Sequence, residues 1–294
     1  MARRRSWKAP ALAQGEKLGA RRAAPQLSEL GIAGDLGAVA HYVDPAYYTK
    51  TYRSRTEDVY YYVNEALASG GPVLEYGVGN GRIALPMARA GIDVTGIDLS
   101  APMLDSLRTQ LKDEAKDVRG RIELRRGDMR RVKLKRRFPL VIASFNTVLH
   151  LYERQDMERF LACVHHHLTP KGRFVFDFSM PHPADLCLDP DKAYGAPRIR
   201  HPTTGELTRY AERFVYDPLR QVLLVNMDFM PEGKSPSFTV PLTHRQYFPA
   251  EMEALLHYNG FRDIDFRGDF SDKALDEDVE SLIVSCRPQR GYRP

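Results

Sequence analysis

Short apolar runs alternate with amphipathic stretches along most of the chain, and each apolar run ends at a polar residue or a turn. The runs at 73–76, 92–97, 122–124, 140–145 and 172–179 have the length and composition of buried strands. Most of the stretches between them carry apolar residues at helical spacing, so helices are expected there. Strands that alternate with helices predict an α/β protein with a mostly parallel sheet.

The C-terminal part adds one more helix and two more strands. The helix is expected from Pro249 to a stop at Gly260, and the strands at 261–267 and 279–286. Together with the five runs before them, these strands predict a Rossmann-like sheet of seven strands.

The segment between the fifth strand and this helix is too long to be a simple connection. Alternating apolar residues at 207–216 and 222–230 flank Asp217-Pro218-Leu219-Arg220, which is a hairpin signal, and 237–248 adds a further strand. We therefore expect an antiparallel insertion at about 182–246. Such insertions usually act as lids.

The first apolar run leads into a glycine loop, Val73-Leu-Glu-Tyr-Gly-Val-Gly-Asn-Gly81. Gly77 and Gly79 allow positive φ and let a ligand lie against bare backbone. The spacing G-x-G-x-G differs from the G-x-G-x-x-G of dinucleotide sites, which disfavours a nicotinamide oxidoreductase. Glu75 at the strand end would repel a pyrophosphate but could accept hydrogen bonds from an ammonium or a hydroxyl group. Taken alone, Glu75 could also be an ordinary surface carboxylate.

The second run ends at Asp98, about 20 positions beyond the glycines. A carboxylate at this place can accept hydrogen bonds from both hydroxyls of an adenosine ribose. Leu99 and Met103 would then lie beside the adenine. Ser100 is expected to cap the next helix. Asp98 could instead be a simple turn residue, so the order of the later motifs decides between the two interpretations.

Two later motifs complete a pattern that covers Tyr47 to Cys286. They are Gly127-Asp128-Met129 and the run L-x-P-x-G-R-F-V-F-D from Leu168 to Asp177. In this order, with the acidic strand ends and the glycine loop, they resemble the class I S-adenosylmethionine (SAM) dependent methyltransferases. The resemblance is to bacterial small-molecule enzymes, similar to amino-sugar and peptide-natural-product N-methyltransferases.

The resemblance implies a fold, a cofactor and a set of site residues. It implies that the last two strands are an antiparallel pair, that the insertion caps the substrate, and that SAM binds at the glycine loop. Asp128 would accept from the adenine amino group and Met129 would pack on the ring. The implied cofactor-binding residues are Tyr48, Glu75, Gly77, Gly79, Asp98, Leu99, Met103, Asp128, Met129 and Asn146.

The methyl acceptor is expected beside residues that orient it. His150, just past the fourth strand, and Tyr48 or Tyr42 from the N-terminal helix region are the candidate catalytic residues. His150 could instead be a helix-capping residue. One or two of the tyrosines could form an aromatic wall for the cationic sulfonium, and most of the others are expected to pack in the core.

The basic residues of the chain are concentrated at its start. The net charge is +5, and residues 1–24 hold seven Arg or Lys residues against Glu16 alone, so this segment accounts for the whole excess. We expect a basic, disordered tail over 1–40 and a methyltransferase domain over 41–294. A second basic cluster, Arg125 to Arg137, is interpreted as a solvated edge of the sheet, with an acidic substrate or RNA phosphate as the alternative.

Composition narrows the remaining function classes. No apolar run approaches 18 residues, which argues against a membrane span, and three scattered cysteines favour the cytoplasm over an oxidising compartment.

No metal site is expected. His165, His166 and His167 are neighbours on a helix, cannot converge on one ion and are interpreted as its polar end. Ser144-Phe-Asn-Thr lacks the box that clamps a flipped base, which disfavours nucleic acid.

The sequence therefore predicts a SAM-dependent methyltransferase that acts on a small molecule. Nitrogen is favoured over oxygen as the acceptor atom. A homodimer is compatible with the sequence. The alternative is a binding or assembly protein that keeps the fold, and the cofactor site with it, without transferring methyl groups.

Overall fold

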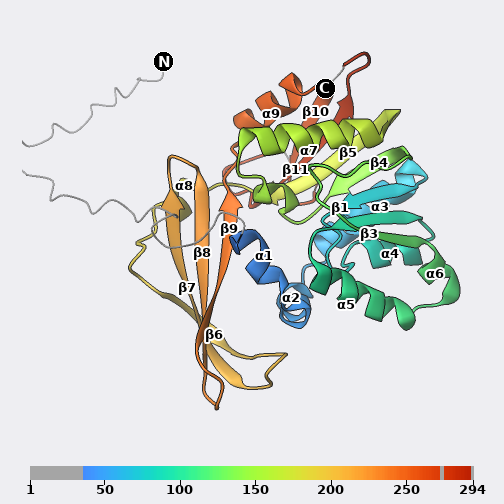
Figure 1. The fold of residues 1–294 in the computed structure, drawn as a ribbon. Coiled ribbons are helices and arrows are strands. Elements are labelled where there is room, and N and C mark those ends of the chain that lie inside the picture. The colour runs from blue at the N-terminus through green and yellow to red at the C-terminus, as the bar shows by residue number, and fades with distance from the viewer. Residues whose placement is uncertain (1–35, 272–274, 293–294) are drawn as a thin grey trace, which may run out of the picture.

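A seven-stranded sheet forms the centre of the molecule in the computed structural model, which describes residues 36–271 and 275–292 (Figure 1). Its strand order is β10-β11-β5-β4-β1-β2-β3. All neighbours are parallel except β11, which pairs antiparallel with both β5 and β10. The predicted fold is thus confirmed. The strands are β1 (Val73–Tyr76), β2 (Val94–Asp98), β3 (Ile122–Arg126), β4 (Phe138–Ala143), β5 (Leu168–Ser179), β10 (Phe261–Gly268) and β11 (Ser281–Pro288).

Helices cover both faces of this sheet because strands buried on two sides need apolar partners on each. One buried cluster joins the sheet to α7 and α9, and a second joins it to α3, α4 and α5. Ser100 caps α5 as expected, its side chain accepting a hydrogen bond from the Met103 amide. These helices and the shorter ones are α3 (Glu57–Ser69), α4 (Ala84–Arg89), α5 (Ala101–Lys112), α6 (Lys116–Gly120), η2 (Thr147–His150), α7 (Arg154–His167), α8 (Pro183–Leu186) and α9 (Pro249–Tyr258).

A second, four-stranded sheet stands beside the first (Figure 1). All its pairs are antiparallel, in the order β6-β7-β8-β9, and it lies within the segment predicted as an insertion. The strand β6 was not predicted, because Gly195 and Pro197 are poor strand residues. We call this sheet the lid sheet. Its strands are β6 (Tyr194–Arg200), β7 (Leu207–Asp217), β8 (Val222–Pro231) and β9 (Phe238–Arg245).

The N-terminal helices α1 (Leu36–Val39), η1 (Ala40–Tyr42) and α2 (Pro45–Tyr52) lie between the two sheets (Figure 1). Residues 36–40 were predicted as part of a disordered tail, and they are helical instead. Helix α1 packs on β9, where Gly37 approaches the lid so closely that a Cβ would lie 2.3 Å from Thr243 Oγ1. Contact with the lid orders this segment, which no local pattern indicates. The rest of the predicted tail, residues 1–35, lies outside the described residues.

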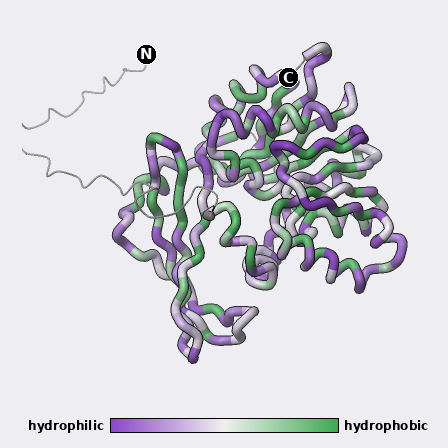
Figure 2. The backbone as a smooth tube through the Cα atoms, in the orientation of Figure 1, coloured by the Kyte–Doolittle hydropathy of each residue, from purple (hydrophilic) through white to green (hydrophobic). Residues whose placement is uncertain are grey.

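Apolar residues concentrate on the strands of the central sheet, whereas the outer turns and helix surfaces are hydrophilic (Figure 2). Within the described residues, every helix is too short or too polar to cross a membrane.

Candidate functional site

A cavity of about 540 Å³ opens at the carboxyl ends of β1, β2 and β4, under the N-terminal helices. Ligands of open α/β sheets usually bind at this edge. The structure brings almost all of the predicted site residues together here. Those that line the cavity are Tyr42, Tyr48, Glu75, Gly77, Gly79, Asp98, Leu99, Met103, Asp128, Met129 and His150.

The glycine loop forms the floor of the cavity without side chains. Gly77 and Gly79 have φ of 69° and 53°, the region that L side chains rarely adopt. A Cβ on Gly77 would lie 2.4 Å from Thr147 Oγ1. Both positions therefore require glycine, and the bare backbone between β1 and α4 leaves room for a ligand.

Asp98 is fixed at the end of β2 by backbone donors. The amides of Gly79 and Ser100 each donate to one of its carboxylate oxygens, at 2.7 Å. Burial raises the pKa of this carboxyl, and the two amides oppose that shift. Each oxygen keeps a free lone pair, so the carboxylate can still accept from two neighbouring hydroxyls.

Glu75 at the end of β1 is almost completely buried, with 1% of its surface exposed. Ser144 Oγ donates to its Oε1 at 3.3 Å, and its Oε2 has no hydrogen-bond partner. Burial raises the pKa of Glu75 to about 8, against an opposing effect of Arg82. An unpaired buried oxygen at the cavity wall is suited to a ligand N–H or O–H donor.

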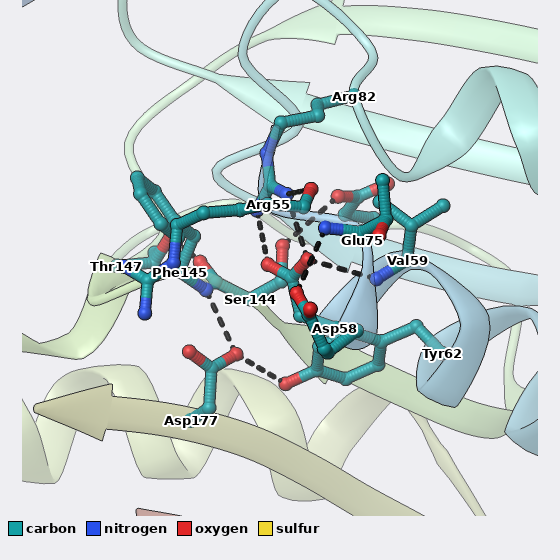
Figure 3. Close-up of polar contacts among 12 residues, drawn as sticks. Arg55, Asp58, Val59, Tyr62, Glu75, Arg82, Ser144, Phe145, Thr147 and Asp177 are labelled. Atoms are coloured by element: carbon teal, nitrogen blue, oxygen red, sulfur yellow. Dashed lines mark hydrogen bonds and ion pairs between the residues drawn. The ribbon is translucent and has the colours of Figure 1, made fainter. Parts of the chain in front are cut away.

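A polar network lies beside Glu75 (Figure 3). The Arg82 guanidinium pairs with both carboxylate oxygens of Asp58 on α3, an ion pair with 15% and 3% of the two side chains exposed. The same guanidinium lies 4.5 Å from the centroid of the Phe145 ring. Arg82 is therefore held in place by two neighbours, and it is also a lining residue of the cavity.

The network continues to β5 through Asp177 (Figure 3). Tyr62 Oη and the Phe145 amide both donate to Asp177 Oδ1, at 2.6 and 2.8 Å. Burial raises the pKa of Asp177 to about 6. Sequence reasoning missed Asp58, Arg82 and Asp177 as site residues. Asp177 is the last residue of the L-x-P-x-G-R-F-V-F-D motif, and this acidic position was the available signal for it.

Asp128 has a partner that the sequence did not indicate. Asp128, expected to receive the adenine amino group, has both oxygens bonded by the Arg130 guanidinium, at 2.8 to 3.1 Å. Burial alone would raise the pKa of Asp128, but the hydrogen bonds and charge of Arg130, together with the charge of Arg131, outweigh it and lower the pKa. Arg130 also pairs with Asp156 of α7, so the part of the cavity beside Asp128 is bordered by an ion-pair network.

Asn146 is the predicted cofactor residue that the structure places elsewhere. It is not among the lining residues of the cavity. Its Oδ1 accepts hydrogen bonds from the amide and the hydroxyl of Ser179, and its φ is 62°. Asn tolerates this left-handed conformation better than most residues. Asn146 therefore ties the turn after β4 to the end of β5.

Tyr42 and His150 meet at the other end of the cavity, where the acceptor is expected. Tyr42 Oη and His150 Nε2 are 2.7 Å apart. Burial is the main cause that lowers the pKa of His150 to about 4 and raises that of Tyr42 well above 10. At neutral pH this end of the cavity therefore presents an uncharged imidazole and an intact phenol.

The other tyrosines of the N-terminal segment surround His41. Its ring centroid lies 5.2 to 6.2 Å from those of Tyr42, Tyr47, Tyr48 and Tyr52. Of this group Tyr42 and Tyr48 line the cavity. Burial raises the pKa of Tyr48 to about 12. These two rings form part of the cavity wall and the others pack around them, while an aromatic wall for a sulfonium stays a prediction.

The three consecutive histidines lie on α7, away from the cavity. His167, interpreted from sequence as part of a polar helix end, is instead fully buried, with its Nδ1 2.8 Å from Tyr76 Oη and its Nε2 accepting from the Leu134 amide. The His167 ring is therefore part of the hydrophobic core. Among residues 36–271 and 275–292 no group of three or more His, Cys, Asp or Glu side chains could hold a metal ion.

Comparison with known proteins gives the same result as the geometry. Residues 73–172 match the family model described as a methyltransferase domain. The chain is 32% identical over 112 residues to the cypemycin N-terminal methyltransferase of a Streptomyces species, covering 38% of this chain and 43% of that protein. It is 27% identical over 128 residues to the dTDP-3-amino-3,4,6-trideoxy-alpha-D-glucopyranose N,N-dimethyltransferase of Streptomyces venezuelae, covering 44% and 51%. The chain thus spans about half the length of these two relatives.

Among solved structures, the methyltransferase CcbJ from Streptomyces caelestis superimposes with a TM-score of 0.71 at 24% identity, over 84% of this chain and 98% of that one. The match therefore extends the common fold beyond the glycine-loop segment to the lid sheet. The resemblance recognised from sequence is confirmed: the chain carries a methyltransferase domain and has the fold of the class I SAM-dependent methyltransferases.

Proposed function

We propose that this protein transfers a methyl group from SAM to an amino group of a small-molecule or peptide acceptor. The observation that carries the proposal is the convergence of two carboxylates, the buried Glu75 and the half-buried Asp98, on a cradle of positive-φ glycines at the carboxyl edge of the sheet. That arrangement offers acceptors for an ammonium group and for a ribose diol in one cavity.

The residues fit SAM at each of its polar groups. Glu75, with its unpaired Oε2, would receive the ammonium of the methionine part, and Asp98 the two ribose hydroxyls. Leu99 and Met103 would border the adenine. The acidic wall also suits the positive sulfonium, because buried carboxylates favour a nearby cation. Asp128 contributes to adenine recognition in this proposal only if it can share its oxygens with Arg130.

When bound, SAM supplies an activated methyl group: the acceptor lone pair forms the new bond to carbon, the sulfur–carbon bond breaks, and S-adenosylhomocysteine leaves. The protein must mainly align the acceptor and exclude water. Tyr42 of η1 and Tyr48 of α2 line the cavity and would help to exclude water from it. His150 contacts the acceptor as an uncharged hydrogen-bonding group, since burial lowers its pKa to about 4.

Two observations support nitrogen as the acceptor atom. One relative is named an N-terminal methyltransferase and the other an N,N-dimethyltransferase. An amine must also be uncharged to attack, and the buried His150 and Tyr42 offer no negative charge that would hold it as an ammonium. A small-molecule or peptide acceptor, a cytoplasmic location and a homodimer remain predictions.

The test is calorimetric titration with SAM, followed by assay of S-adenosylhomocysteine with a panel of amines and hydroxyl compounds. We expect SAM to bind and amines to be methylated. If SAM does not bind, the proposed function is wrong. If SAM binds and no acceptor in a broad panel yields S-adenosylhomocysteine, the alternative of a non-catalytic SAM-binding protein is favoured. Titration with NAD tests the nicotinamide oxidoreductase class, and we expect no binding.

A further inference from the structure

The turn that follows β4 has an unfavourable backbone and yet supplies much of the cavity wall. Its lining residues are Ser144, Phe145, Thr147 and His150. Between the first and the third of these, Phe145 and Asn146 have φ of 55° and 62°. This left-handed region is uncommon for any residue but glycine, and a bulky aromatic residue is a clear outlier there. Contacts from outside the turn must therefore hold it in this conformation.

The neighbouring strand β5 supplies these contacts at Asp177. The Phe145 amide donates to Asp177 Oδ1 at 2.8 Å, and the Asn146 amide donates to the Asp177 backbone carbonyl at 3.3 Å. The Asp177 side chain is buried, with 4% of its surface exposed, and Tyr62 Oη of α3 donates to the same Oδ1 at 2.6 Å (Figure 3). A buried carboxylate is stable only where it is hydrogen-bonded. Asp177 thus fixes both left-handed residues relative to β5.

The ring of Phe145 carries this constraint to the N-terminal helices. Its centroid lies 4.8 Å from that of Tyr52 and 6.1 Å from that of Tyr48, both in edge-on contacts. The Arg82 guanidinium lies over the same ring. The ring therefore joins the turn to α2, whose Tyr48 lines the cavity. A different φ at residue 145 would move the ring away from these partners.

The other end of the turn carries His150. The helix η2 begins at Thr147, directly after the left-handed pair, and ends at His150. Thr147 also fits closely against the glycine loop, since a Cβ on Gly77 would lie 2.4 Å from its Oγ1. The direction in which the chain leaves β4 thus decides where η2 lies. The contact of His150 with Tyr42 depends on that direction.

We propose that Asp177, supported by Tyr62, is a positioning residue for methyl transfer: it holds the turn after β4 in its left-handed conformation, so that Phe145 and His150 stand at the cavity wall. This assignment rests on the proposed function and adds residues from β5 and α3, neither of which lines the cavity. Asp177 touches neither SAM nor the acceptor, and it transfers no proton. Its role requires only hydrogen-bond acceptance, which an amide can also provide.

Steady-state kinetics test this role, with an amino-sugar nucleotide and a short peptide with a free amino terminus as acceptors. We expect Asp177→Ala to lower kcat about tenfold, because the turn then adopts other conformations in which His150 leaves the cavity wall. The acceptor KM and the SAM dissociation constant should each change less than about threefold. Asp177→Asn keeps an oxygen that accepts from the Phe145 amide and should retain most of the rate.

A milder variant carries the same test if Asp177→Ala does not fold. Tyr62→Phe removes one hydroxyl donor and keeps the ring, and we expect kcat to fall about threefold. The matched control is Tyr61→Phe, because Tyr61 is the next tyrosine of the same helix and both rings lie edge-on to Phe270. It should leave kcat unchanged.

Nitrogen NMR of histidine-labelled protein gives a readout that needs no acceptor. The His150 ring is assigned from the signal lost in His150→Gln. Its signal should shift in Asp177→Ala, because the contact with Tyr42 depends on the turn, and should return in Asp177→Asn. His201, which is stacked on Tyr47 beside the lid sheet, should keep its signal in both variants.

Four outcomes would overturn the positioning role: an unchanged kcat in the folded Asp177→Ala variant, an unchanged His150 signal in it, an Asp177→Asn variant as slow as Asp177→Ala, or equal losses in Tyr61→Phe and Tyr62→Phe. The third would mean that the charge of Asp177 is required. Failure of the wild-type protein to bind SAM or to methylate an acceptor would contradict the proposed function instead. The His150 signal would then still decide whether Asp177 holds the turn.

Discussion

The two ends of the cavity are built in different ways. At the cofactor end, Asp98 is held by amides 2 and 19 positions away in the chain, and Glu75 lies on the strand that leads into the loop. At the proposed acceptor end, Tyr42 comes from an N-terminal turn and His150 from a turn after β4, and behind His150 lies His244 of a lid strand.

The two ends also differ in the charge of their side chains. The cofactor end is lined by carboxyl groups that can pair with a cation, whereas the acceptor end holds imidazoles and a phenol that burial keeps uncharged. Changes at the first end should therefore alter cofactor affinity, and changes at the second should alter use of the acceptor. The predictions below test this division, from the largest effect to the smallest.

The largest effect is expected from Asp98→Ala. The variant loses the acceptor for the ribose hydroxyls and leaves the amides of Gly79 and Ser100 without their partner. We expect SAM affinity to fall about 100-fold or more, equivalent to about 3 kcal/mol, measured by calorimetric titration.

Asp93→Ala is the matched control for Asp98→Ala. Asp93 lies just before the same strand, with 59% of its side chain exposed in an ion pair with Arg121. Its removal should leave SAM affinity unchanged. Equal losses in the two variants would mean that Asp98 acts through the fold alone.

Glu75→Gln should weaken SAM binding about tenfold at pH 8.5, because an ionised acceptor of the ammonium is replaced by a neutral one. The wild-type affinity should rise as the pH increases through about 8, the pKa of Glu75, since only the ionised carboxylate pairs with a cation. The variant should lack this rise. Titrations at pH 6 and pH 8.5 measure it, and a wild-type affinity that is flat over this range would contradict the assignment.

The same pKa predicts a change in stability. Folding raises the pKa of Glu75 from 4.5 to about 8, so its contribution to stability is complete below about pH 4.5 and is lost as the pH rises through about 8. Glu75→Gln removes this loss. Urea unfolding should therefore show wild type losing more stability than the variant between pH 5 and pH 8.5.

His150→Gln tests the neutral end. We expect kcat/KM for an amine to fall about fivefold, near 1 kcal/mol, with SAM affinity unchanged. Because the pKa of His150 is about 4, its titration should not appear between pH 6 and pH 8. Any rise in kcat/KM over that range should follow the amine of the acceptor and persist in the variant. A break near pH 6.5 that disappears in His150→Gln would show that His150 acts as a base.

The smallest effect on binding is expected from Asn146→Ala. Asn146 lies outside the cavity lining and bonds Ser179, so SAM affinity should change less than about twofold. The protein should nevertheless lose about 1–2 kcal/mol of stability, because two hydrogen bonds disappear and Ala is strained at a φ of 62°. Calorimetry and urea unfolding of one sample distinguish these outcomes, and a large loss of affinity would restore Asn146 as a cofactor residue.

Much of the cofactor end could be predicted from the sequence. Apolar runs fix the strands, the parallel order brings their carboxyl ends to one edge, and glycines mark the loop. Glu75 is the third of the four residues of β1, and Asp98 is the last residue of β2. Both positions can therefore be expected at the carboxyl edge of the sheet once the two strands are recognised. The lid hairpin could also be predicted from the sequence, because its turn is formed by neighbouring residues. In the structure Asp217 accepts hydrogen bonds from the amides of Leu219 and Arg220 in that turn.

The tertiary structure alone decided which of these side chains are free. Asp128 is paired with Arg130, Asn146 with Ser179, and Arg82 with Asp58, whereas Glu75 keeps an unpaired oxygen. Spacing along the chain does not show whether a carboxylate will meet a guanidinium or a ligand.

The sequence by itself thus determined the strands, the glycine cradle and the acidic strand ends, because apolar periodicity and the conformational freedom of glycine are local properties of the chain. Only the folded chain decided the acceptor end, where His244 meets His150 and Gly37 meets Thr243. Those contacts depend on how the lid sheet and the N-terminal helices pack on the core. That packing is set by many apolar contacts between distant segments, and no local pattern encodes it.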